Sequence, residues 1–252
     1  MTSPSAPAGR ALEIWSADLD AIAQLLESAE AAVHLLAPSE RDWSERPPAN
    51  PARIHRRRAR IALRMLLVAA GAPALPGAEL LIDPAGKPRL AAGDLHFSLS
   101  HTTGLALFAI GGCGPLGIDL EMEREVQLGP ERRVLIEAAA QAMAPGLGSD
   151  FLDAWTCLEA LAKARGCGIG TLLTELGITA SRARPLRPGD TVASARTVLS
   201  ASGLAVAGLK LPDGLYGAIA GPRECLTSPP EPRTLDAGLC RQIMQGISAA
   251  AP

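Results

Sequence analysis

The sequence is poor in aromatic residues and in lysine. Only 3% of its 252 residues are aromatic although 48% are hydrophobic, so Leu, Ala, Val and Ile have to fill the interior. Of its 24 cationic residues, only Lys87, Lys163 and Lys210 are lysines. Lysine is a compact, mobile point charge, whereas arginine is a rigid planar fork. The three lysines are therefore candidates for positions that need a mobile charge.

Long apolar runs, paired cysteines and an excess of basic charge are also missing. No stretch approaches the ~20 apolar residues of a transmembrane helix, and residues 1–10 lack the apolar run of a signal peptide. A net charge of −2 argues against a general nucleic-acid binder. The five cysteines include no Cys-x-x-Cys pair, so neither zinc nor a disulfide framework is expected. We expect a cytoplasmic protein with reduced thiols that binds neither membrane nor nucleic acid.

The first part of the chain, residues 1–115, alternates between helical and strand patterns. A helix is expected to begin at Ser16 or Asp18 and to run to about residue 30, and the Pro-rich stretch 38–51 reads as a loop. The other predicted elements are a strand at 12–15, an amphipathic helix at 52–70, and strands at 79–83, 95–100 and 105–110.

Residues 116–225 repeat roughly the same order, β-α-α-β-β-β. The predicted elements are a strand at 116–121, helices at 131–143 and 149–166, and strands at 191–199, 204–211 and 215–220. Ser149 is the expected N-cap of the second helix and Gly166 its C-terminal glycine. Residues 226–252 read as a tail with one weak helix. The order predicts an α+β fold of two similar lobes.

Acidic and apolar residues alternate in the stretch 116–121. Leu116, Ile118 and Leu120 are expected to face the core, which places Asp119 and Glu121 on the other face, roughly 7 Å apart. Carboxylate oxygens suit Mg²⁺. The same alternation is typical of the solvated polar face of an edge strand, and this strand taken alone favours that interpretation.

The predicted helix at 149–166 carries a second polar pair. Glu159 and Lys163 lie four residues apart and share a face, which is also the pattern of an exposed ion pair contributing a few tenths of a kcal/mol. The apolar positions expected to pack inward are Phe151, Trp155, Leu158 and Ala162.

Further polar candidates lie in the first half. Ser100 and His101 fall at the end of a strand, and Lys87 lies in a Gly-Lys-Pro turn. Several arginines lie on one face of the helix at 52–70, with Arg56 and Arg58 beside it, and they suit either a phosphate-rich ligand or a solvated surface. These are Arg53, Arg57, Arg60 and Arg64.

The order of these motifs is more specific than any one of them. Gly-Lys-Pro (86–88), Phe-x-x-Ser-His (97–101), Gly-Ile-Asp-x-Glu (117–121) and Trp-x-x-x-Glu-Ala-x-x-Lys (155–163) follow one another. Over about residues 12–170 this series resembles the Sfp-type 4′-phosphopantetheinyl transferases. The resemblance implies a pseudo-twofold pair of α+β lobes with coenzyme A between them. It also implies transfer of the phosphopantetheine arm to a serine of an apo acyl or peptidyl carrier protein, releasing 3′,5′-ADP.

The resemblance also implies a role for each site residue. Asp119, Glu121 and Glu159 would hold Mg²⁺, or Mn²⁺ in its place, and Glu159 would deprotonate the carrier serine. Lys163 would stabilise the departing 3′,5′-ADP. The remaining contacts to coenzyme A would come from Ser100, His101, Lys87 and Arg53 or a neighbour of Arg53.

Two features depart from the family pattern. Leu158 stands where the family usually has Lys, and residues 132–142 read as an Ala-rich helix where an aromatic turn is usual. Carrier preference among fatty acid, polyketide and nonribosomal peptide pathways is therefore not inferred. Two other functions stay open: a different Mg²⁺-dependent phosphate-group transferase, and a non-catalytic protein that binds coenzyme A or a carrier.

Overall fold

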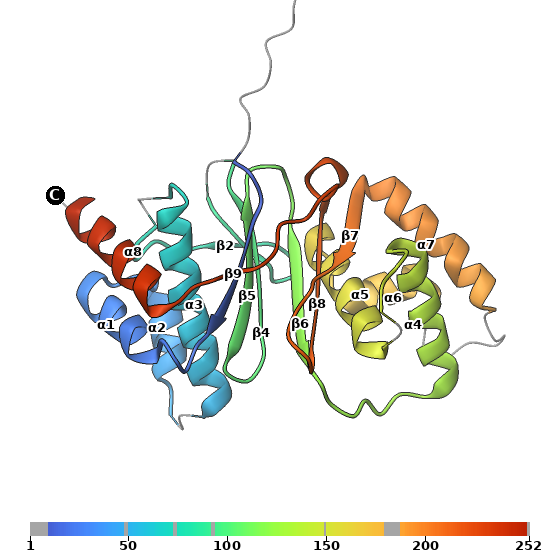
Figure 1. Cartoon of the computed structure of the whole chain (residues 1–252), viewed down its shortest axis with the longest axis horizontal. Helices are drawn as coiled ribbons and strands as arrows, with labels where there is room; N and C mark the ends of the chain where they lie inside the picture. Colours follow the sequence, from blue (N-terminus) through green and yellow to red (C-terminus); the bar gives the residue numbers. More distant parts are fainter. Residues whose placement is uncertain are drawn as a thin grey trace, which may run out of the picture.

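The computed structural model describes residues 10–47, 50–72, 75–91, 94–148, 150–178 and 187–250. Two small sheets face each other, and helices cover the outer face of each (Figure 1). The predicted α+β class is confirmed. Before the chain passes from the four-stranded to the three-stranded sheet, its elements are β1 (Glu13–Asp18), α1 (Ala23–Val33), α2 (Pro38–Glu45), α3 (Pro51–Ala69), β2 (Leu81–Ile82), β3 (Pro88–Arg89), β4 (His96–His101) and β5 (Leu105–Gly111). The remainder are β6 (Gly117–Met122), α4 (Pro130–Met143), α5 (Phe151–Arg165), α6 (Ile169–Glu175), α7 (Pro188–Ser202), β7 (Leu204–Gly208), β8 (Leu215–Pro222), a 3-10 turn (Arg223–Cys225), β9 (Arg233–Thr234) and α8 (Ala237–Ala250).

The two main sheets meet through an apolar layer. The four-stranded sheet has the order β4-β5-β1-β9, and the three-stranded sheet has the order β6-β8-β7. Ile14 and Leu107 of the first sheet belong to the same buried cluster as Ile118 and Ile219 of the second. Since β4 and β6 lie in contact across this layer, the Ser-His motif comes close to the Asp-x-Glu motif.

Helices α3 and α5, which carry the cationic and acidic motifs, begin and end at clear capping signals. Asn50 caps α3 by accepting a hydrogen bond from the backbone N–H of Arg53, at 2.8 Å. Asp150 caps α5 by accepting one from Leu152 N–H at 2.9 Å, and Gly166 ends the helix in the left-handed conformation at φ 63°. Gly166 is thus confirmed as the C-terminal glycine, whereas the predicted cap, Ser149, lies outside the described residues.

Two predicted segments have the wrong secondary structure. The expected loop at 38–51 contains helix α2, because Pro38 occupies the first turn and Glu40 accepts a hydrogen bond from Ala37 N–H at 3.2 Å. The expected strand at 191–199 lies inside α7, although its Thr and Val residues favour strands locally. Thr191 and Ala195, one helical turn apart, are buried, and α7 packs against α4, so tertiary packing overrides the local preference.

The first predicted helix begins too early. Strand β1 continues to Asp18 and pairs there with Leu105 of β5, so Ser16 and Asp18 belong to the sheet. The side chain of Asp18 then accepts hydrogen bonds from the backbone N–H groups of Asp20 and Ala21, and α1 starts at Ala23. The Asp residue that resembles a helix cap therefore closes the turn before the helix.

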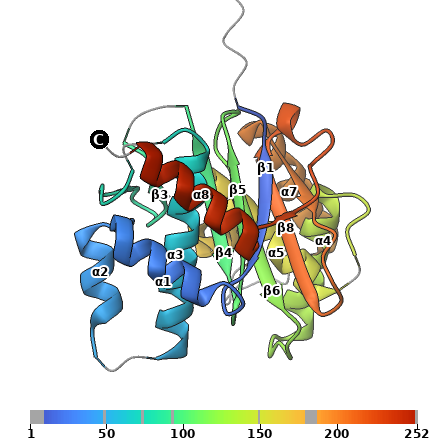
Figure 2. The same cartoon turned by 60° about the vertical axis from the view of Figure 1, so that its left-hand side comes forward.

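The C-terminal segment returns to the four-stranded sheet. β9 pairs in parallel with β1. Helix α8 packs on α1 and α3, and Figure 2 shows it lying against these helices. Leu235, Cys240, Ile243 and Ile247 are buried in the same core as residues of α1 and α3. The C-terminal residues that were predicted to be a tail therefore belong to the core beneath the four-stranded sheet, as far as the structure describes them. Within the described ranges, no helix has both the length and the apolar character needed to cross a membrane.

Candidate functional site

Gly117 allows α5 to lie directly on strand β6. A Cβ atom at position 117 would overlap the carbonyl oxygen of Ala160 and would lie 2.5 Å from the backbone nitrogen of Ala164. Any side chain here would therefore push the helix away. The close approach sets the distance between Asp119 on the strand and the helix face that carries Glu159 and Lys163.

Lys163, Asp119 and Ser100 form a polar network between α5, β6 and β4. The ammonium of Lys163 donates to Asp119 Oδ1 at 2.6 Å, to the carbonyl of Ile118 at 3.1 Å and to Ser100 Oγ at 3.2 Å. Ser100 Oγ in turn donates to Asp119 Oδ1 at 2.8 Å. The ion pair of Lys163 is therefore with Asp119, and the expected solvated strand face is wrong because α5 covers it and buries Asp119.

Glu159 and Glu121 lie in the electrostatic field of this network. Burial raises the pKa of Glu159, the carboxylates of Asp119 and Glu121 raise it further, and the Lys163 ammonium lowers it. Glu121 accepts two hydrogen bonds from the guanidinium of Arg124, each at 3.2 Å. Among the described residues, no three His, Cys, Asp or Glu side chains form a group that could hold a metal ion. Asp119 and Glu121 are instead paired with Lys163 and Arg124.

A cavity of about 430 Å³ opens beside the network. It lies between α3, the turn before β3, β4 and the end of α5, and none of the described residues that line it carries a carboxylate. Its ionisable and hydroxyl side chains are those of Arg56, Arg60, Lys87, Ser98, Ser100, His101 and Lys163, together with the Cys167 thiol. An excess of positive charge without carboxylates is the environment that a polyphosphate requires.

Lys87 holds the wall of this cavity together. Its ammonium donates to the carbonyls of Leu116 at 2.5 Å and Lys163 at 2.8 Å, which joins the Gly-Lys-Pro turn to the start of β6 and the last turn of α5. Burial lowers the pKa of Lys87 to about 8, and the Lys163 ammonium contributes to this effect. A lysine has three N–H donors, so one is left for a ligand.

The arginines of α3 separate into different environments. Arg56 and Arg60 line the cavity, whereas Arg53 lies outside its lining, where it donates to the carbonyl of Arg46. Arg64 is completely buried and donates to the carbonyls of Leu75 and Ala78. Among the described residues of the predicted face, Arg60 alone lines the cavity, and its partner there is Arg56, which the prediction placed outside that face. The i,i+4 spacing of Arg56 and Arg60 is the signal that could have identified the pair.

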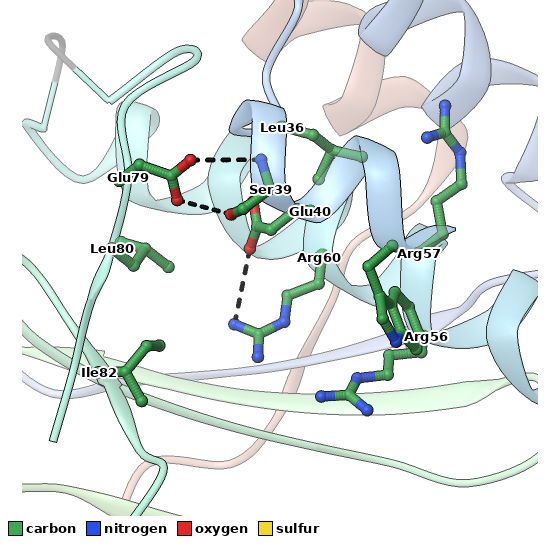
Figure 3. A pocket seen from close by; sticks show the side chains of 10 residues that line it. Leu36, Ser39, Glu40, Arg56, Arg57, Arg60, Glu79, Leu80 and Ile82 are labelled. Carbon is green, nitrogen blue, oxygen red and sulfur yellow. Dashed lines mark hydrogen bonds and ion pairs between the residues drawn. The ribbon is translucent and has the colours of Figure 1, made fainter. Parts of the chain in front are cut away.

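A second, smaller cavity of about 200 Å³ adjoins the first and shares Arg56 and Arg60 with it. Figure 3 shows Arg60 reaching towards Glu40, with 3.9 Å between the charged atoms, and Ser39 bonded to Glu79. The guanidinium of Arg56 stacks over the Trp43 ring at 4.6 Å. Trp43 and Glu40 of α2 thus contact the same two arginines that line the first cavity.

Leu158 is part of the core and not of the site. Its side chain is fully buried among α4, α5 and α6 residues, as is Leu161. The prediction that Leu158 packs inward is confirmed. A lysine at this position would have to leave the core to reach the cavity.

No protein-family model matches this chain, and no curated protein sequence matches it. The case for a function therefore rests on the chain's own residues.

The pKa of His101 is expected to change when an anionic ligand binds in the cavity. Burial and then the charges of Arg56, Arg60, Lys163 and His55 lower the pKa of His101 to about 4. Because the unfolded chain binds this proton near pH 6.5, the stability that neutral His101 supplies is present above about pH 6.5 and is lost as the pH falls towards 4. A bound phosphate offsets the cations, so inorganic pyrophosphate should raise this pKa.

The measurement is an NMR titration of the His101 ring protons with and without saturating pyrophosphate. His34, which does not line this cavity, serves as the internal control. Bound pyrophosphate with an unchanged His101 titration would place the anion elsewhere.

Proposed function

We propose that this chain transfers the 4′-phosphopantetheine group of coenzyme A to a serine of an apo acyl or peptidyl carrier protein. The observation that carries the proposal is the cationic cavity beside the Asp119, Glu121 and Glu159 carboxylates. The cavity suits the phosphates of coenzyme A, and the carboxylates suit a divalent cation. The ordered motifs that build both features resemble those of the transferase family named above.

The finer description of the fold belongs to the same proposal. Each main sheet has helices on its outer face, and the cavity is built from α3 and β4 on one side and α5 on the other. This supports two lobes in a pseudo-twofold arrangement with coenzyme A between them. We propose that the reaction takes place in the cytoplasm, where thiols stay reduced.

The carboxylates suit a divalent cation by their donor chemistry, although no three of them form a ready-made metal-binding group among the described residues. The side-chain hydrogen bonds of Asp119 recorded in the described residues both fall on Oδ1, which leaves Oδ2 for a ligand. Glu159 and Glu121 add further oxygens, and their mutual repulsion contributes to the raised pKa of Glu159. Asp119, Glu121 and Glu159 would hold Mg²⁺, which when bound neutralises charge on the pyrophosphate.

The chain's own residues then position and neutralise the reacting groups. Arg56 and Arg60 orient the nucleotide phosphates, and Lys163 offers its charge to the departing 3′,5′-ADP. Glu159 accepts the proton of the carrier serine, directly or through water, because a carboxylate with a raised pKa is a stronger base. The serine oxygen then forms a bond to the β-phosphorus as the bond to 3′,5′-ADP breaks.

The proposal is tested with purified protein, coenzyme A, Mg²⁺ and a broad panel of apo-carriers. Mass spectrometry should show the phosphopantetheine mass on at least one carrier serine and release of 3′,5′-ADP. Binding of coenzyme A without modification of any carrier would support a non-catalytic binding protein. Turnover of another nucleotide instead would support a different phosphate-group transferase.

A further inference from the structure

Two cysteines lie where the chain passes between the sheets. Cys113 is in the connection that leads from β5 of the four-stranded sheet to β6 of the three-stranded sheet. Cys225 ends the 3-10 turn after β8, from which the chain returns to β9 of the four-stranded sheet. Both side chains are partly exposed, and both are free thiols.

The strand pairing brings these two connections together. β6 and β8 are antiparallel with Gly117 opposite Ala220, so the residues before Gly117 run beside those after Ala220. A Cβ atom on Gly114 would lie 2.9 Å from Cγ of Pro222, which shows that the two segments remain in contact beyond the strands. At the end of this contact the Cys113 and Cys225 side chains lie close enough for Cys113 to raise the pKa of the Cys225 thiol.

We propose that Cys113 and Cys225 form an oxidation site that closes to a disulfide when a peroxide reaches it. The other three cysteines differ in their surroundings. Cys157 and Cys240 are fully buried, and Cys167 lies in the wall of the cationic cavity. The sequence indicated reduced thiols without a paired framework. The fold adds a pair that is separated by more than a hundred positions and that no spacing rule reveals.

The chemistry balances with one peroxide for each disulfide. Cys225 holds its proton, since burial and the nearby Cys113 side chain raise its pKa to about 12, so Cys113 reacts first. The Cys113 thiolate attacks one peroxide oxygen, the O–O bond breaks, and a sulfenic acid forms. The Cys225 sulfur then attacks the sulfenic sulfur as its proton passes to the departing hydroxide, so the S–S bond forms and water leaves. Two thiols and one hydrogen peroxide give one disulfide and two waters.

The disulfide would change what holds the two sheets together. It would enclose residues 113–225, which contain the whole three-stranded sheet and α4 to α7, in one covalent loop. Loops of this length strongly restrict the unfolded chain. The bond would also fix the segment before Leu116, whose carbonyl accepts the Lys87 hydrogen bond at the cavity wall.

The test uses the reduced, full-length protein in its native state. Equimolar hydrogen peroxide is added, the remaining thiols are blocked with N-ethylmaleimide, and the digest is analysed by mass spectrometry. The expected result is a peptide pair joined through Cys113 and Cys225, with Cys157 and Cys240 unmodified. Without reductant the melting temperature should rise by about 5–10 °C, and dithiothreitol should reverse the rise.

Cys225→Ser and, as a second variant, Cys225→Ala should show neither the joined peptides nor the rise. If a variant folds poorly, the presence or absence of the joined peptides in the wild-type protein still tests the proposal. Full N-ethylmaleimide labelling of Cys113 and Cys225 after peroxide would overturn the proposal, and so would a disulfide that joins other cysteines. Because transfer activity is not measured, the outcome is independent of the proposed reaction.

Discussion

Replacing Glu159 with Gln is expected to lower phosphopantetheine transfer by about 10²–10⁴-fold without lowering the melting temperature. The loss follows because Gln cannot accept the serine proton and supplies a poorer ligand for Mg²⁺. The unchanged or higher stability follows from electrostatics. Burial and the Asp119 carboxylate raise the pKa of Glu159, so its charge opposes folding, and Gln removes that charge.

The pH dependence gives this prediction a second signature. Since the folded-state pKa of Glu159 lies above that of the unfolded chain, its contribution to stability is fully present at low pH and is lost as the pH rises through the folded-state value. The melting temperature of Glu159→Gln minus that of the wild type should therefore increase as the pH rises above about 4. Thermal melts across this range check the sign.

Glu137→Gln is the matched control, because Glu137 is a helical glutamate paired with Arg133 at 3.0 Å on α4, away from the cavity. It should leave transfer and Mg²⁺ affinity unchanged. A Mg²⁺ titration with coenzyme A present completes the test. Wild-type affinity and wild-type turnover in Glu159→Gln would remove Glu159 from both proposed roles.

Gly117→Ala is expected to damage both stability and function. The added Cβ atom overlaps backbone atoms of Ala160 and Ala164, which cannot rotate away, so α5 has to shift off the strand. Overpacking of this kind costs about 1–3 kcal/mol, which corresponds to a fall in melting temperature of about 2–12 °C. The shift also moves Lys163 relative to Asp119, and a displacement near 1 Å can cost about 100-fold in rate.

Gly170→Ala is the control for this substitution. Gly170 lies in helix α6, and nothing lies within 4 Å of a Cβ atom placed there. Alanine is a better helix former than glycine, so this variant should be neutral or slightly more stable. Thermal melts and transfer assays on both variants, with coenzyme A affinity as a third measure, check the prediction. A Gly117→Ala protein with wild-type stability and rate would mean that α5 does not depend on this contact.

The periodic patterns predicted the long elements well. The apolar spacing in α3 and α5 comes from packing one helix face on a core, and such packing leaves a regular signal in sequence. Strands β5, β6 and β8 are buried on both faces, and short apolar runs between turn residues marked β5 and β8 instead. Helix α7 was missed because its Thr and Val residues prefer strands, and only its contact with α4 makes it helical. Helix α2 was missed because its prolines and charges resemble a loop.

The site was only partly predictable for a related reason. The sequence placed Asp119 and Glu121 on one strand face and Glu159 and Lys163 on one helix face. It could not show that the two faces meet, so the Lys163–Asp119 pair and the burial of Asp119 emerged only from the fold. Local spacing also could not separate Arg60, which lines the cavity, from Arg64, which is bonded inside the core. That difference depends on the distant loop at Leu75 and Ala78.

The return of the C-terminal segment to the first sheet sets an order of assembly during synthesis. The three-stranded sheet and its helices are built from residues 117–222, a continuous stretch. The core beneath the four-stranded sheet needs Leu235, Cys240, Ile243 and Ile247 as well as residues near the start of the chain. On the ribosome, therefore, the later-made half can complete its core before the earlier-made half does. The nascent β1 strand and α1 and α3 have to wait, with apolar surface exposed, until α8 emerges, and we expect this stage to be where chaperones engage the chain.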